Sequence, residues 1–366
     1  MTVLHLSHAA DASDGGIATA VTDLIAAQRA AGLEVDWLTS DHFKGFHRDQ
    51  KLLGAVKVAH PSLLHLHGLW RSPTRIASRL ADLSHSLVVA PHGMLDPWAL
   101  VHSRWKKRLA WSLFERRALL SARCIHVLTP AEAADTDALD LGRPIAVIPN
   151  GVSMPTTAAA GPPPWVNTIP TGSSVLLYLG RFHPKKGLVP LLKAWQAVAE
   201  EAERHGWWLA LVGYGDRGVL AEQVAAAKAK GELTRVSLHG PCFDEQKHAC
   251  FTAANAFVLP SFSEGLPMAA LEAMAYQLPS LLSTACNIPE AFSSGAALPA
   301  EPEDHVILAK SLHRLFELSE TESAAMGSAA HALVARGYSW PRVAEQTRQL
   351  YDWALGYAER PGFVEG

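Results

Sequence analysis

A pair of glutamates is the first feature of the sequence that could do chemistry. Glu264 follows the apolar run 257–259 in a short loop, and Glu272 comes eight residues later, after Pro267. Proline suits the first turn of a helix, so the spacing predicts a helix that starts beside the Glu264 carboxylate. Backbone N–H groups at such a helix start favour an anion such as a diphosphate. A capping acid and a solvated glutamate would show the same spacing.

A cationic loop is the second such feature. Arg181, Lys185 and Lys186 follow the apolar run 175–179 and Gly180. Cations at a strand end can neutralise a diphosphate leaving group without a metal ion. Taken alone, an ordinary solvated basic loop explains these residues better.

Two glycine turns follow predicted strands. Gly15 and Gly16 come after the run 3–7 and before a helical pattern, so their backbone can approach a ligand or simply turn. The segment 213–218 has the spacing of a dinucleotide fingerprint. This segment follows the second predicted strand of its half, whereas a dinucleotide fingerprint follows the first strand. We therefore predict a structural turn there.

Histidines end two predicted strands of the first half. His92 follows the run 87–90, at the strand end that faces the binding edge of an open α/β sheet. His65 and His67 end another strand, with the spacing of two metal ligands. No third ligand is clustered with them in the sequence, so we predict no metal site.

A basic, aromatic helix is predicted over 102–117. Trp105, Leu109 and Leu113 recur at helical spacing with cations between them. Such a helix can lie on an anionic membrane surface. The alternative, which the sequence supports equally, is a surface helix whose apolar stripe faces the core.

Strand, turn and helix alternate along the chain. The strands are expected as continuous apolar runs, which is typical of parallel sheets covered by helices on both faces. The proline-rich segment 153–170 interrupts the alternation and is predicted to be a linker. We expect an α/β protein with two Rossmann-like domains, 1–152 and 171–340, joined so that they form a cleft.

Composition excludes several function classes. The 366 residues are 49% hydrophobic and carry a formal net charge of −3, so no nucleic-acid partner is predicted. Cys124, Cys242, Cys250 and Cys286 lack metal-ligand spacing and are expected to be reduced, buried thiols. The first residues do not resemble a signal peptide, and no apolar run is long enough to span a membrane. A cytoplasmic protein, or one bound to the inner face of the cytoplasmic membrane, is expected.

Together these motifs resemble the retaining glycosyltransferase family 4, whose members have the GT-B fold. Four elements carry the resemblance, in family order and across nearly the whole chain. They are the glycine loop Gly15-Gly16, the hinge I-P-N-G-V at 148–152, G-R-x4-K-G from Gly180 to Gly187, and E-x7-E from Glu264 to Glu272. The family hinge often continues with aspartate, where this chain has Ser153.

The resemblance implies a role for each matching position. Arg181 and Lys186 would hold the diphosphate, Glu264 would contact hydroxyls of the donor sugar, and Glu272 would bind the ribose. His92 would contact the donor sugar close to the acceptor. The expected catalytic residues are Arg181, Lys186, Glu264 and His92. The further expected donor-binding positions are Gly15, Gly16, Gly180, Gly240, Cys242, Gly265, Leu266, Pro267 and Met268. The last helix, in about 341–366, would return to the first domain.

The implied activity is transfer of a hexose from a UDP- or GDP-sugar to a glycan or lipid-linked oligosaccharide, as in bacterial cell-surface polysaccharide biosynthesis. Anomeric configuration would be retained by a front-face reaction, and no metal or other cofactor is expected. Two alternatives remain open at this point. One is a nucleotide-sugar-binding protein without activity, and the other is a different GT-B enzyme, such as an epimerase or a phosphorylase.

Overall fold

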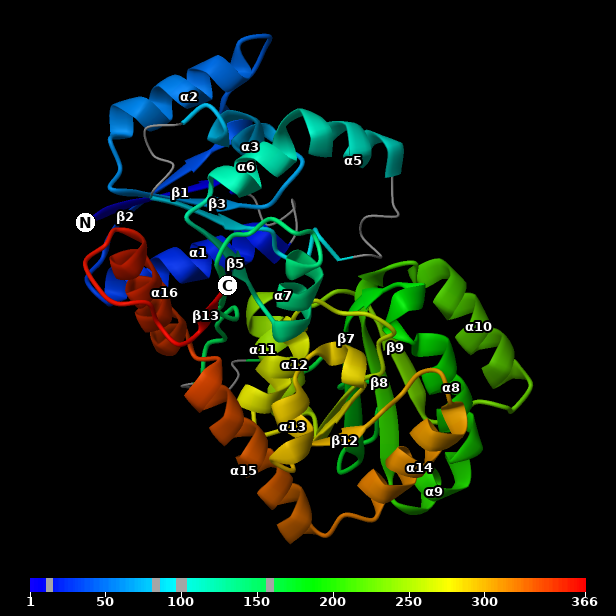
Figure 1. Ribbon diagram of the computed structural model, residues 1–366. Helices are drawn as coiled ribbons and strands as arrows, with labels where there is room; N and C mark the ends of the chain where they lie inside the picture. Colours follow the sequence, from blue (N-terminus) through cyan, green and yellow to red (C-terminus); the bar gives the residue numbers. More distant parts are fainter. Residues whose placement is uncertain (11–15, 81–85, 97–103, 156–160) are drawn as a thin grey trace. The chain divides into compact units, whose positions relative to one another are not determined.

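The computed structural model describes residues 1–10, 16–80, 86–96, 104–155 and 161–366. These residues form two compact units (Figure 1). The first unit comprises Met1–Gly151 together with Tyr338–Gly366, and the second comprises Val152–Gly337. Each unit is built on one sheet.

The sheet of the first unit is parallel except at one edge. Its strands are β1 (Thr2–Ser7), β2 (Glu34–Thr39), β3 (Leu63–His67), β4 (Leu87–Ala90), β5 (Cys124–Val127), β6 (Ile145–Val147) and β13 (Val364–Glu365). They lie in the order β13-β6-β5-β4-β3-β1-β2, and β13 pairs antiparallel with β6. The strands are almost continuously buried, because helices cover both faces of the sheet.

The helices of the first unit divide between the two faces. They are α1 (Gly16–Ala30), α2 (Arg48–Ala59), α3 (Ser72–Ala77), α5 (Arg104–Ala110), α6 (Arg116–Ser121), α7 (Pro130–Asp137) and α16 (Trp340–Ala354), with the π-helical turn η4 (Trp111–Glu115) and the 3-10 turn η2 (Ser40–His42). Side chains of α2, α3 and α6 pack on one face, and those of α1 and α16 pack on the other. In Figure 1, α16 lies beside α1 although more than 300 residues separate them in sequence.

The C-terminal segment therefore completes the first unit. Trp340 begins α16, and its indole ring packs on the backbone of Gly151. A Cβ atom on Gly151 would lie 2.4 Å from the nearest ring atom, so only glycine fits this contact. The hinge glycine predicted from the sequence is thus also required by packing within its own unit.

The sheet of the second unit is entirely parallel. Its strands are β7 (Ser174–Phe182), β8 (Trp207–Gly215), β9 (Val236–His239), β10 (Ala256–Leu259), β11 (Ser280–Leu282) and β12 (Ala297–Pro299). They lie in the order β12-β11-β10-β7-β8-β9. The chain therefore leaves β7 in one direction through β8 and β9, and returns to the other side of β7 at β10. This is the strand order of a doubly wound nucleotide-binding fold.

Most helices of the second unit connect these strands, and the last two follow β12. They are α8 (Leu188–Ala197), α9 (Ala199–Arg204), α10 (Arg217–Ala229), α11 (Asp244–Ala253), α12 (Met268–Ala275), α13 (Pro289–Ser293), α14 (His305–Phe316) and α15 (Glu320–Gly337), with the 3-10 turns η5 (Pro184–Lys186) and η6 (Thr284–Cys286). Helices α8 and α9 are separated at Val198, whose ψ of 20° leaves the helical region.

Several sequence expectations differ from the structure in detail. The segment expected to be a linker belongs to the second unit, and its Trp165 and Ile169 are buried there. The returning segment starts at Tyr338 rather than near 341. The short edge strands β12 and β13 were not predicted, because two or three residues give no periodicity. In the described part of the chain, no helix combines the length and the apolar character that crossing a membrane requires.

Candidate functional site

The strongest candidate site lies where the strand order of the second unit reverses, between β7 and β10. Ligands of open parallel sheets bind at the carboxyl ends of the strands, at this switch point. Gly180 lies near the end of β7, and the turn η5 that follows carries Lys186. The loop after β10 carries Ser261 and Glu264. The two motifs found in the sequence therefore meet at one point of the sheet.

Lys186 and Glu264 form a direct ion pair. The Nζ atom of Lys186 lies 2.5 Å from Oε1 of Glu264, and the two side chains are only 17% and 7% exposed. The hydroxyl of Ser261 donates to the same oxygen at 2.5 Å. The other oxygen of Glu264 makes no hydrogen bond with any described residue, so it is available to a ligand. Glu264 is therefore not the capping acid that its spacing alone permitted.

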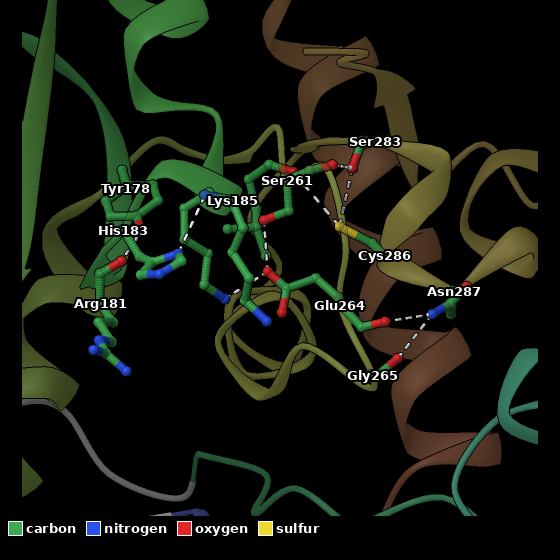
Figure 2. Close-up of polar contacts among 12 residues, drawn as sticks. Tyr178, Arg181, His183, Lys185, Ser261, Glu264, Gly265, Ser283, Cys286 and Asn287 are labelled. Carbon is green, nitrogen blue, oxygen red and sulfur yellow. Dashed lines mark hydrogen bonds and ion pairs between the residues drawn. The ribbon is translucent and has the colours of Figure 1, made fainter. Parts of the chain in front are cut away.

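The loops that carry this pair are fixed by backbone contacts. The N–H of Phe262 donates to the carbonyl of Lys185 at 2.7 Å. Gly187 has a φ of 68°, and a Cβ atom there would lie 1.8 Å from the carbonyl oxygen of Pro260. The amide of Asn287 donates to the carbonyls of Glu264 and Gly265 at 2.7 Å and 3.0 Å, as Figure 2 shows. The ion pair thus sits between two rigidly joined turns.

Helix α12 follows the Glu264 loop and carries the second glutamate. The helix starts at Met268, and Pro267 lies directly before it in an extended conformation. Gly265 is exposed and Leu266 and Met268 are half-buried, so the N–H groups of this turn lie near the surface. Glu272 pairs with Lys247 of α11, with 2.7 Å between Nζ and Oε1. It is therefore not simply a solvated surface residue.

Arg181 is placed differently from Lys186. Its side chain is exposed and makes no hydrogen bond with the described residues, whereas its carbonyl accepts a hydrogen bond from buried Tyr178 at 2.8 Å. Figure 2 shows its guanidinium directed away from Glu264. The carbonyl of Gly180 lies so close to Gly213 that a Cβ atom there would be 1.8 Å from it. Close packing therefore requires Gly213 and Gly215 at the end of β8, in agreement with the predicted structural role, whereas Gly218 has open space around it.

The loop after β9 contains two of the expected donor-binding positions, Gly240 and Cys242. Gly240 is half-buried, and Cys242 is 8% exposed with its thiol beside Cys250. Burial raises the pKa of the Cys242 thiol, so it is a neutral group in the loop. Sequence reasoning missed an exposed aromatic pair here: the rings of Tyr214 and Phe243 lie 6.3 Å apart, with 51% and 61% of the residues exposed.

The expected site residues of the first unit lie near the carboxyl ends of its strands. Gly16 begins α1, whereas Gly15 lies outside the described residues. His92 follows β4 in a turn and has a φ of 55°, a conformation that non-glycine residues rarely adopt. The carboxylate of Glu132 accepts hydrogen bonds from the N–H groups of Gly93 at 2.5 Å and Leu128 at 2.8 Å. Glu132 therefore holds the turn that contains His92.

A cluster of buried histidines surrounds His92 in the same unit. His65 and His67 are joined by His5 of β1 and His126 of β5, and all four are 0–3% exposed. Burial lowers the pKa of His5 and of His126 to about 4, and it also lowers the pKa values of His65, His67 and His92. The rings are therefore neutral at pH 7. Only the spacing of His65 and His67 on one strand is visible in the sequence, and the order of the strands is needed to find the other histidines.

The basic helical segment exposes its apolar stripe. Trp105 of α5 is 68% exposed, Leu109 is 53% exposed, and Leu113 of η4 is 58% exposed. Lys106, in the same turn of α5, holds its ammonium group 5.6 Å from the centroid of the Trp105 ring. The alternative in which this stripe faces the core is therefore wrong. The start of the predicted helix, 102–103, lies outside the described residues.

Family models match both units. The model for "Glycosyl transferases group 1" matches residues 164–332, and the model for "Glycosyl transferase 4-like domain" matches residues 40–151. The two matched segments contain the Lys186–Glu264 pair and His92, respectively.

Curated relatives are glycosyltransferases. O-antigen chain mannosyltransferase B of Escherichia coli is 32% identical over 177 residues, which are 48% of this chain and 45% of that protein. The GDP-mannose:cellobiosyl-diphosphopolyprenol alpha-mannosyltransferase of Xanthomonas campestris is 29% identical over 310 residues, which are 83% of this chain and 77% of that protein. The chain thus spans about half the length of the first relative and about three quarters of the second.

Solved structures share the fold. The structure of Alr3699/HepE from Anabaena in complex with UDP and glucose superposes with a TM-score of 0.68 over 96% of this chain and 100% of that chain, at 18% identity. This likeness concerns the fold alone. From the family models, the relatives and the two doubly wound sheets, we conclude that the chain belongs to glycosyltransferase family 4 and has the GT-B fold.

Proposed function

We propose that the protein is a retaining hexosyltransferase that uses a nucleotide-sugar donor bound at the second unit. The observation that carries this proposal is the meeting of Lys186 and Glu264, 78 residues apart in sequence, at the switch point between β7 and β10. A paired lysine and a carboxylate with one free oxygen offer a cation for a phosphate and an acceptor for a sugar hydroxyl.

The charges of the site suit a diphosphate leaving group. As the bond between the anomeric carbon and the diphosphate breaks, negative charge develops on phosphate oxygens. Lys186, Arg181 and the N–H groups at the start of α12 would stabilise that charge. In the free protein Lys186 is neutralised by Glu264, so donor binding has to share the ammonium group between the carboxylate and a phosphate.

Glu264 is assigned to the sugar rather than to the reacting carbon. Two hydrogen bonds to Oε1 hold its carboxylate in place, which favours a contact with hydroxyls of the donor sugar. The proposed reaction is front-face: the leaving diphosphate accepts the proton of the acceptor hydroxyl as the new bond forms on the same side. Glu272 would accept hydrogen bonds from the ribose, and Lys247 holds it in position.

The nucleoside and the acceptor are proposed from a pair of exposed aromatic rings and from the activities named for two relatives. The exposed rings of Tyr214 and Phe243, beside Gly240 and Cys242, offer a surface on which a planar base can stack. A Xanthomonas relative uses GDP-mannose and a diphosphopolyprenol-linked acceptor, and an Escherichia coli relative is an O-antigen mannosyltransferase. These names favour GDP-mannose over a UDP-sugar, and a lipid-linked oligosaccharide of cell-surface polysaccharide synthesis as the acceptor.

A lipid-linked acceptor would require contact with the cytoplasmic membrane. The exposed stripe Trp105, Leu109 and Leu113 lies on a segment that also exposes Lys106 and Arg108, a combination that binds anionic lipid surfaces. Sedimentation with phosphatidylglycerol vesicles would test this contact. Replacing the three apolar residues by serine should weaken binding at least about tenfold, whereas Val58→Ser, at an 80% exposed residue of α2, should not. Equal binding of both variants would refute the contact.

The activity is tested by incubating the protein with UDP- and GDP-hexoses and a diphosphopolyprenol-linked oligosaccharide. The proposal predicts release of one nucleoside diphosphate, an acceptor heavier by one hexose, and retention of anomeric configuration by NMR. Donor binding without transfer to any acceptor would favour a non-catalytic binding protein instead. Activity that depends on inorganic phosphate would favour a phosphorylase, and conversion of the nucleotide sugar itself would favour an epimerase.

A further inference from the structure

A continuous chain of hydrogen bonds runs through the buried histidines of the first unit. His5, His65 and His126 lie on β1, β3 and β5, on the sheet face that α1 and α16 cover. His5 and His65 are direct partners in the pairing of β1 with β3. Because every ring nitrogen in this hydrogen-bond chain except Nδ1 of His92 has one partner, the direction of each hydrogen bond can be worked out from the ends.

One end of the hydrogen-bond chain is fixed by a backbone carbonyl. Nε2 of His126 lies 2.8 Å from the carbonyl oxygen of Ile148, which can only accept, so Nε2 carries the proton. The buried ring is neutral, and its Nδ1 is therefore an acceptor. Nε2 of His65, 3.2 Å away, must donate to it. His65 is consequently also protonated on Nε2 and has an acceptor at Nδ1.

Two residues from helices continue the chain in the same direction. The hydroxyl of Tyr351 in α16 lies 2.7 Å from Nδ1 of His65 and must donate to it. The Tyr351 oxygen can then only accept from Nε2 of Gln28 in α1, at 2.9 Å. Thr347, whose hydroxyl donates to a carbonyl of its own helix, accepts from the same nitrogen at 3.0 Å. The orientation of the Gln28 amide is thereby fixed, with Oε1 directed at His5.

The other end of the hydrogen-bond chain is His92. Nε2 of His5 donates to Oε1 of Gln28 at 2.8 Å, so Nδ1 of His5 accepts from Nε2 of His67 at 2.8 Å. Nδ1 of His67 in turn accepts from Nε2 of His92 at 2.9 Å. In the described part of the chain, Nδ1 of His92 has no hydrogen-bond partner. Every donor points toward Ile148, and the lone pair that remains is on His92.

We propose that this histidine relay, defined as His126, His65, Tyr351, Gln28, His5, His67 and His92, holds His92 as the neutral Nε2-protonated tautomer and presents its Nδ1 as a hydrogen-bond acceptor for a hydroxyl group of the sugar substrate. The relay cannot reverse, because the carbonyl of Ile148 cannot donate. Donation from Nε2 also makes Nδ1 a stronger acceptor. The tautomer assignment stands on the relay alone, and the role toward a sugar rests on the proposed function.

The backbone of His92 is held independently of its ring. The φ of 55° at His92 is followed by a φ of 73° at Gly93, whose N–H donates to the buried carboxylate of Glu132. A histidine kept in a strained turn by one group and in one tautomer by another is pre-organised for a single contact. The other relay members are positioning residues, since they act only through His92.

A metal site is the competing interpretation of the same rings. One ring nitrogen each of His5, His65 and His67 lies within 4.8 Å of the others. The hydrogen bonds described above already use both nitrogens of all three rings. Nδ1 of His5 and Nε2 of His67 share a proton at 2.8 Å, which leaves no lone pair on His67 Nε2 for an ion.

The tautomers are tested by long-range 15N–1H correlation spectra of the protein labelled with 15N-histidine, at pH 7 and without substrate. Single His→Asn variants of the five histidines assign their signals. The relay predicts five neutral rings, all protonated on Nε2. A Nδ1-protonated or charged ring among the five would overturn the proposal. So would stoichiometric zinc, nickel or cobalt in the purified protein, or loss of the five Nε2–H signals on adding zinc.

Tyr351→Phe combined with Thr347→Val breaks the relay far from His92, and Tyr357→Phe is the matched control at a 73% exposed tyrosine. With neither hydroxyl left to accept from its nitrogen, the Gln28 amide is no longer held in one orientation, and His92 should show both tautomers. Turnover should fall on the order of tenfold, the effect of one hydrogen bond, with KM for the nucleotide less affected than kcat. A single Nε2 tautomer of His92 in this double variant would overturn the relay. Absence of any glycosyl transfer by the unmodified protein, with the predicted tautomers intact, would instead refute the proposed function.

Discussion

In the second unit the strand ends carry charged side chains, whereas in the first unit they carry neutral rings. Lys186 and Glu264 meet between β7 and β10 as a largely buried ion pair. The histidines of β1, β3 and β5 are buried more deeply, and burial keeps them uncharged. The two units share a parallel-sheet design, yet we expect the second to bind a charged group such as a phosphate and the first to bind a neutral hydroxyl. The family fold alone does not specify this difference.

Acid should affect the first unit most strongly. The histidine pKa is about 6.5 in the unfolded chain and is lowered in the folded unit. Below pH 6.5 the unfolded state therefore binds more protons, and the free energy of unfolding falls by about 1.4 kcal/mol per histidine for each pH unit. The pKa values of Glu115, raised by burial to about 7, and of Glu132, also raised, act in the opposite direction and offset part of this loss.

Hydrogen exchange measured by mass spectrometry at pH 7 and pH 5.5, with rates corrected for intrinsic pH dependence, would check this difference. Peptides of β1, β3 and α16 should lose protection by several kcal/mol, and peptides of β7 and β10 should lose less. Replacing the exposed His205 by asparagine provides a control that should not alter the pattern. Equal loss of protection in both units would contradict the contrast between them.

Removing the positive charge of Lys186 in the second unit should cause the next largest effect. Lys186→Ala deletes the group proposed to stabilise the leaving diphosphate and leaves Glu264 buried without its partner. We expect turnover to fall on the order of 10²- to 10³-fold. The exposed Lys193 of α8 offers a control, because its replacement by alanine removes a positive charge from the same unit. If Lys186→Ala and Lys193→Ala were equally active, the site assignment would fail.

Glu272→Gln should weaken donor binding with less effect on the chemical step. The proposed ribose contact is a hydrogen bond to a charged group, which contributes about 1.5–3 kcal/mol. Affinity for the nucleoside diphosphate should therefore fall about tenfold or more. Calorimetric titration of this variant, with Glu290→Gln as the exposed control, would measure the change. An unchanged Kd would remove Glu272 from the donor site.

Gly151→Ala tests the packing of α16 rather than the chemistry. The added Cβ atom would lie within 2.5 Å of two atoms of the Trp340 ring. We expect a loss of about 1–3 kcal/mol in the free energy of unfolding of the first unit, the usual result of overpacking. Chemical denaturation would show it, and Gly54→Ala, at a helical glycine with open space around it, should not be destabilised. Stability equal to that of the unmodified protein would mean that Trp340 does not require glycine here.

Much of the fold follows from the sequence because the strands are unbroken apolar runs between helical stretches. The Lys186–Glu264 contact could be anticipated, since both residues follow strands that end at the same edge of a sheet. The histidine relay could not. It depends on which strands are neighbours, on the register that pairs His5 with His65, and on a tyrosine supplied by a helix 286 residues beyond His65. The exposure of Trp105 was likewise undecided, because helical spacing does not say which face is covered.

The central claim is that a nucleotide-sugar donor binds at the Lys186–Glu264 site of the second unit. Isothermal titration calorimetry of the unmodified protein with UDP and with GDP, repeated with Lys186→Ala, tests it most directly. The account predicts that one of the two nucleotides binds with a stoichiometry of one, and that Lys186→Ala weakens this binding more than about tenfold. Binding of neither nucleotide, or the same affinity in Lys186→Ala, would contradict it.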